Sequence, residues 1–128
     1  MKLLLDTHVL LWWMHNDPRL SATAIAGVED VGNQIILSSI SAIEIAIKVR
    51  LGKLRLGLPL PLFFKRGMEG LRATEWPVLI SHAACLIELP LHHRDPFDRI
   101  LVAQAQVEGM ILVSADEKIK LYGIPTLW

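Results

Sequence analysis

Short apolar runs alternate with longer segments of helical periodicity along this chain, and this alternation limits the possible folds more than any other feature. Buried strands are predicted at 3–5, 34–38 and 110–113, with a weaker strand near 73–76 and a last short one within 124–127. Helices are predicted at 9–15, 21–30, 41–51, 60–69, 81–88 and 96–108, with one helical turn after 116. Strands that alternate with helices pair in parallel. We therefore expect an α/β fold of three layers, α/β/α, with a central parallel sheet of four to five strands.

Length and charge narrow the class of protein. With 128 residues and no linker-like segment, the chain is predicted to form a single domain over 1–128. Its 13 Lys and Arg balance 13 Asp and Glu, so any attraction for nucleic acid must be local. The single Cys85 excludes an internal disulfide and fits a reducing compartment. No apolar run is long enough to span a membrane, and a cytoplasmic location is expected.

The best-defined helix start lies in the segment His93-Arg94-Asp95-Pro96-Phe97-Asp98-Arg99. Proline favours a first helical position, and Asp95 before it can cap the helix. Asp98 shares a ridge with Leu101 and Val102 at helical spacing, so its carboxylate should lean toward the packed side of the domain. A buried carboxylate needs a partner.

Similar acids follow the predicted strands. Asp6 follows the first strand, Glu44 lies in the first turn of the helix after the second, and Asp116 follows the strand at 110–113. Groups beyond the carboxyl ends of parallel strands share one crevice, which Asp98 would reach from its helix. Each pair of carboxylates about 5 Å apart costs roughly 3 kcal/mol at an effective dielectric near 20, so the cluster needs a counter-charge. Oxygen ligands suit Mg²⁺ or Mn²⁺ rather than zinc, and the histidines show no paired ligand spacing. This chemistry is metal-dependent hydrolysis of phosphodiesters.

Each acid also has a structural interpretation. Ser41 to Glu44 matches a capping box, and Glu44 to Lys48 is a favourable spaced ion pair. In the segment 114–117 the pattern predicts that Glu117 closes the capping box, which leaves Asp116 free. Asp6 has no capping role in the predicted pattern. Asp95 is open to two interpretations, as a cap or as a group that supports the metal ligands.

Taken together, these segments resemble the PIN domain, specifically the VapC-like toxins of bacterial type II toxin–antitoxin systems. The matching segments are 4–8, the helix that carries Glu44, 93–106 and 112–116, so the resemblance extends over essentially the whole chain. It implies an Mg²⁺- or Mn²⁺-dependent endoribonuclease that forms a homodimer and is silenced by a cognate antitoxin protein. It also implies that the metal-binding and catalytic acids correspond to Asp6, Glu44, Asp98 and Asp116, with supporting hydroxyls at Thr7 and Ser114.

An RNA substrate requires local positive charge. Seven of the thirteen basic residues lie between positions 48 and 72, and the alternative is a merely solvated helix face. We consider Lys48 and Arg50 in this group, and Arg99 beside Asp98, as candidate phosphate contacts, although Arg99 could instead pair with Asp95. The aromatic residues, Trp12 and Trp13 among them, are assigned to the core or to a dimer or antitoxin contact.

Two other classes of protein remain open. A catalytically silent PIN-like module that binds protein or RNA would use the same fold without cutting. A phosphoacceptor domain also places acids beyond parallel strands, but it needs adjacent acids after the first strand, where this chain has Asp6 alone.

Overall fold

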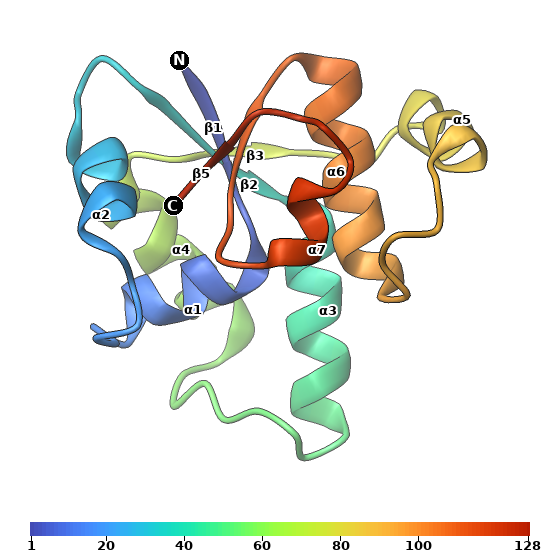
Figure 1. Ribbon diagram of the computed structural model, residues 1–128. Coiled ribbons are helices and arrows are strands. Elements are labelled where there is room, and N and C mark those ends of the chain that lie inside the picture. Colours follow the sequence, from blue (N-terminus) through green and yellow to red (C-terminus); the bar gives the residue numbers. More distant parts are fainter.

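Five parallel strands form the central sheet in the computed structural model, which describes residues 1–128 (Figure 1). The strands are β1 (Lys2–Leu5), β2 (Gln34–Ser38), β3 (Thr74–Trp76), β4 (Ile111–Val113) and β5 (Thr126–Leu127). Their order in the sheet is β3-β2-β1-β4-β5, and every neighbouring pair is parallel. The predicted strand positions and the parallel α/β architecture are confirmed.

Helices cover both faces of the sheet. Figure 1 shows α1 (Thr7–Met14), α2 (Ala22–Glu29) and α4 (Leu60–Leu71) on one side, and α5 (Ile80–Glu88) and α6 (Pro96–Glu108) on the other. α3 (Ser39–Arg50) extends away below the sheet, and the short α7 (Glu117–Lys120) follows β4. The three-layer α/β/α arrangement is therefore confirmed. None of the seven helices has the length and apolar character that a membrane crossing requires.

Alternation along β1 divides the core into two clusters. Leu3 and Leu5 pack with α1, α2 and α4, around the fully buried Phe63. Leu4 points to the opposite face and packs with Leu101 of α6 and its neighbours. A central strand buried on both faces reads as a continuous apolar run, and the sequence 3–5 has that pattern. β1 is thereby held at the centre, and its carboxyl end lies between those of β2 and β4.

The predicted capping of three helices was wrong. α1 begins at Thr7 rather than residue 9, and Asp6 is its N-cap. Ser38 caps α3, so Ser41 lies inside that helix and forms no capping box with Glu44. Asp116, not the predicted Glu117 box, caps α7. Cap patterns are short, and neighbouring polar residues compete for the same backbone N–H groups. The predicted start of α6 is confirmed, because Asp95 is its N-cap and Pro96 its first residue.

Candidate functional site

Asp6 is held rigidly at the junction of β1 and α1. Its backbone N–H donates to the carbonyl of Val113, which extends the pairing with β4 by one residue. One carboxylate oxygen, Oδ1, accepts the N–H groups of His8 and Val9 at 2.7 and 3.2 Å. The other, Oδ2, accepts the hydroxyl of Ser114 at 2.5 Å. Burial raises the pKa of Asp6 above its ordinary value, although these hydrogen bonds oppose the shift.

Glu44 projects from the second turn of α3 and is 1% exposed. Its Oε2 forms an ion pair with Lys48 one turn later, as the spacing predicts. Its Oε1 is buried and has no hydrogen-bond partner. A buried carboxylate oxygen without a partner is costly, so Oε1 of Glu44 is the clearest candidate ligand atom in the site.

Thr7 and Ser41 join the two helices that carry these acids. The buried hydroxyl of Thr7 donates to Ser41 Oγ at 2.9 Å. Because Thr7 follows Asp6 directly and Ser41 lies one turn before Glu44, the contact helps to set the separation between the two carboxylates.

Asp98 lies in the first turn of α6 and is buried, as the sequence predicts. Its pKa is raised to about 7, first by burial and then by the negative charges of Asp95, Asp6 and Glu44, which outweigh the opposing effect of His93. Burial alone would lower the pKa of Lys48, but Glu44, Asp95 and Asp98 together raise it. The acids from β1, α3 and α6 are therefore close enough to act on one another through their charges.

His93 joins Asp98 to Asp116. Its Nε2 lies 2.7 Å from Asp116 Oδ2 and 3.1 Å from Asp98 Oδ2. Its Nδ1 accepts the N–H of Asp95 at 3.0 Å, so a neutral His93 carries its proton on Nε2 and donates it toward the two carboxylates. Potential ligand atoms of His93, Asp98 and Asp116 all lie within 4.8 Å of one another.

His93 was not among the predicted site residues, because the histidines of the sequence show no paired ligand spacing. The signal was the position of this residue two before a capping aspartate, where a histidine can accept the N–H of that aspartate. The partner Asp116 is 23 residues away, and no local pattern indicates that contact.

Asp116 completes the cluster from the end of β4. Burial raises its pKa, but the hydrogen bonds from His93 and from the backbone N–H of Lys118 outweigh that effect, and the pKa is lowered. The N–H of Asp116 donates to Ser114 Oγ at 3.1 Å, and the same hydroxyl donates to Asp6. Ser114 thus links Asp6 and Asp116, and His93 links Asp116 and Asp98.

Neither Arg99 nor Arg50 forms an ion pair with these acids. The Arg99 guanidinium donates to the carbonyls of Leu89 and Leu86 at 3.1 and 3.4 Å, near the end of α5. No contact joins it to Asp95. Arg50 is the last residue of α3 and is exposed, two turns beyond Glu44. Lys48 is the basic residue that the structure brings to the acids.

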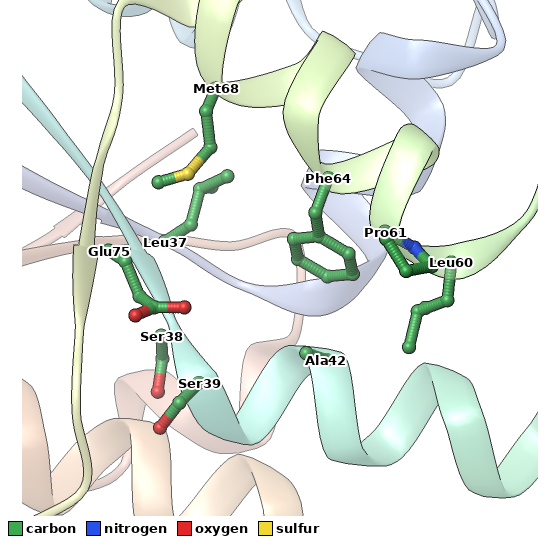
Figure 2. Close-up of a pocket in the computed structure, with 9 residues that line it drawn as sticks. All are labelled: Leu37, Ser38, Ser39, Ala42, Leu60, Pro61, Phe64, Met68 and Glu75. Carbon is green, nitrogen blue, oxygen red and sulfur yellow. The ribbon is translucent and has the colours of Figure 1, made fainter.

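A hollow of about 260 Å³ opens beside Asp6 and Asp116. A separate hollow of about 200 Å³ is lined mainly by apolar groups, with Phe64 projecting from α4 toward α3 and Met68 toward Leu37 (Figure 2). Glu75 is its one titratable residue. The first hollow, which borders the acids, is therefore the better candidate for a catalytic or metal site.

Comparisons with known proteins agree with one another. The model of the PIN domain matches residues 3–124. Ribonuclease VapC22 of Mycobacterium tuberculosis is 30% identical over 129 aligned residues, which cover 98% of this chain and 97% of that protein. Ribonuclease VapC16 of the same organism is 42% identical over 73 residues, which cover 54% and 50% of the two proteins.

Among solved structures, the fold is similar to that of a chain in the structure of VapBC2 from Rickettsia felis, which is bound to a DNA fragment from the VapBC2 promoter. The TM-score is 0.75 at 16% identity, with 98% of this chain and 97% of that chain covered.

We predict that Asp98→Asn stabilises the metal-free protein at high pH. Folded Asp98 keeps its proton until about pH 7, whereas the unfolded chain releases it near the ordinary value of 3.8. The folded state binds more protons within this window, so the contribution of Asp98 to stability falls as the pH rises. The Asn side chain carries no charge at any pH. We expect a gain of at least ~1 kcal/mol at pH 8 and little change at pH 4, measured by urea unfolding with EDTA present.

Glu29→Gln, an exposed acid on α2 without an ionic partner, is the matched control and should change little at either pH. Equal effects of Asp98→Asn on stability at pH 4 and pH 8 would contradict the raised pKa of Asp98 in the folded protein.

Proposed function

The chain belongs to the PIN domain family, and on that premise we propose that it is a metal-dependent endoribonuclease, the toxin of a toxin–antitoxin pair. The names of its VapC relatives support the reaction and the pairing. One observation on this chain carries the proposal. The buried Oε1 of Glu44 has no hydrogen-bond partner, and Glu44 is one of the acids whose charges help to raise the pKa of Asp98.

The residues present fit a hard divalent cation. Their donors are carboxylate oxygens, which Mg²⁺ and Mn²⁺ prefer, and Oε1 of Glu44 is free to serve. We propose that the cation is held by Asp6, Glu44, Asp98 and Asp116. When bound, it would activate water for attack and offset the negative charge that develops on phosphoryl oxygens.

The neighbouring side chains orient these acids. Ser114 holds Asp6 through a hydrogen bond, and Lys48 holds one oxygen of Glu44 while leaving the other available. His93 keeps Asp98 and Asp116 together through the proton on Nε2, and Asp95 fixes the start of α6. We propose positioning roles for Ser114, Thr7, His93 and Asp95, since orientation by such partners controls both metal affinity and activity.

We propose that Lys48 and Arg50 contact phosphates of the RNA, with Lys48 nearest the acids. For Arg99, the bonds to the carbonyls of Leu86 and Leu89 favour a structural role between α5 and α6.

We also propose a cognate antitoxin partner, a homodimer and a cytoplasmic location, with residues 1–128 as one domain. The exposed apolar side chains Ile80, Ile87 and Leu91, in and just after α5, support a contact with another protein chain.

Cleavage of RNA should require Mg²⁺ or Mn²⁺. On a panel of single-stranded and structured RNAs, we expect cleavage by the parent with either ion and none with EDTA. Asp6→Asn and Asp98→Asn should each lower the rate at least ~100-fold, or about 2.7 kcal/mol of activation free energy, because each removes a ligand charge. Glu29→Gln should cut like the parent. If the parent leaves every RNA intact with metal present, the alternative of a silent interaction module gains support.

The cation should also stabilise the folded protein, independently of activity. A ligand at 100 times its dissociation constant adds about 2.7 kcal/mol, so Mn²⁺ should raise the melting temperature of the parent by several degrees. Glu44→Gln should remove most of this increase because it weakens the unpartnered ligand atom. Glu75→Gln, in the apolar hollow of Figure 2, is the control and should melt with the same Mn²⁺ dependence as the parent.

The toxin assignment has a separate test. Expression of the parent should arrest growth of a bacterial host, whereas Asp98→Asn should not. Co-expression with the small open reading frame next to this gene should restore growth, and the two proteins should purify together. Loss of RNA cleavage in that complex would identify the neighbour as the antitoxin, and failure to bind would count against the pairing but not against the nuclease.

A further inference from the structure

Trp12 lies at the meeting point of two hollows on the surface. The hollow beside the acids is bordered by Asp6 and Asp116, with His8, Trp12 and Ala115. A second hollow of about 320 Å³ has His8 and Trp12 in its wall as well. Its remaining lining residues are Leu11, His15, Asp17, Arg19, Lys48, Lys53 and Leu54. A path therefore leads from the acids, past one indole ring, to a surface with basic side chains.

The start of α1 explains why this ring lies there. Asp6 caps the helix, and the side of α1 that carries Thr7 and Leu11 is buried. His8 and Trp12, four residues apart, then share the side that borders the acids, where His8 is exposed and Trp12 is half-buried. The capping bond that holds Asp6 thus also sets the position of the indole.

The indole of Trp12 already makes contacts typical of a stacking site. The Arg19 guanidinium lies over the ring at 4.9 Å, and the rings of His8 and Trp128 lie at 6.0 and 5.7 Å in tilted arrangements. The Arg19 side chain is 68% exposed, so it can move aside or stack on an added ring. Trp13, by contrast, packs against Gly70 of α4, where an added Cβ would lie 2.8 Å from its ring.

Net charge on this surface is small. Arg19 forms a two-point contact with Asp17 and holds the pKa of that carboxyl at about 2, and Lys48 is paired with Glu44. Lys53 is exposed and has no acidic partner within ion-pair distance. An aromatic face with one free cation suits an unpaired nucleobase and its phosphate better than the dense charge of a duplex.

We propose that Trp12 is a stacking platform for one unpaired base of the RNA, next to the phosphodiester at the acids, and that Lys53 contacts a neighbouring phosphate. This inference rests on the proposed nuclease function and adds to it a substrate class, single-stranded RNA. In this proposal Trp12 contacts the substrate, whereas the sequence predicts a core or protein-contact residue.

The test measures binding of a fluorescein-labelled ten-nucleotide RNA by the full chain, in EDTA so that no metal supports cleavage. Trp12→Leu keeps an apolar side chain but no aromatic face, whereas Trp12→Phe keeps the face. Stacking contributes roughly 1–3 kcal/mol per base, and 1.4 kcal/mol corresponds to tenfold, so Trp12→Leu should weaken binding about tenfold or more. Trp12→Phe should stay within about threefold of the parent, and the same RNA in a duplex should bind all three proteins equally weakly.

Lys53→Ala should reduce the magnitude of the slope of log association constant against log salt concentration by about 1. Trp12→Leu should leave that slope unchanged. Lys2→Ala, at an exposed position at the amino end of β1, is the matched control for charge and should not change the slope. With Mg²⁺, Trp12→Leu should raise KM for single-stranded RNA more than it lowers kcat.

Equal binding by Trp12→Leu and Trp12→Phe would overturn the proposal, and so would loss of antitoxin binding by Trp12→Leu with RNA binding intact. If the parent binds single-stranded RNA through Trp12 but never cleaves it with metal, the nuclease proposal fails while the stacking surface stands. If the parent cleaves RNA and Trp12→Leu binds and cleaves equally well, the stacking proposal alone fails.

Discussion

Mutual repulsion of carboxylates is the constraint on which the rest of this structure depends. Asp98 is buried among Asp95, Asp6 and Glu44, and its pKa reaches about 7, first because burial disfavours the ionised form and then because these acids carry negative charge. Such crowding is unfavourable for the fold by itself. The fold tolerates it because β1 is anchored in the middle of the sheet by apolar packing on both faces. The core therefore supplies the free energy that holds the acids together.

Compensation comes largely from backbone groups and from hydrogen bonds of side chains other than Lys and Arg. Asp6, Asp95 and Asp116 are the N-caps of α1, α6 and α7, so each accepts N–H groups from the start of a helix. Helix N-termini carry partial positive charge, which favours nearby carboxylates. Ser114 and His93 add hydrogen bonds between the acids. Lys48 is the only lysine or arginine that pairs with these acids. The centre is therefore strongly acidic although the net charge of the chain is zero.

The same capping arrangement connects the acids to their surroundings. Because Asp6 begins α1, the orientation of that helix determines which side chains border the cluster, and these are His8 and Trp12. Because Asp95 begins α6, Asp98 is held in the first turn of a helix whose same side continues into the core through Leu101 and Val102. A change at either cap would move both a carboxylate and the residues that surround it. The first turns of α1 and α6 thus set the positions of the carboxylates and of the side chains around them together.

By itself, the sequence was sufficient to predict the parallel α/β fold and the strands, and to single out four acids as candidates, because apolar periodicity and strand-end position are local properties. The structure brings Asp98 and Asp116 to one histidine, links Asp6 to Asp116 through Ser114, and leaves Glu44 in electrostatic contact with Asp98. The roles of the caps could not be read reliably, since Ser38 and Ser41, or Asp116 and Glu117, fit similar short patterns. Only the tertiary structure decided the contacts of His93 and of Arg99 and the place of Trp12 beside the acids. These depend on which groups meet across the fold, as Ser114 meets Asp6 over a separation of 108 residues, and such contacts leave no local pattern in the chain.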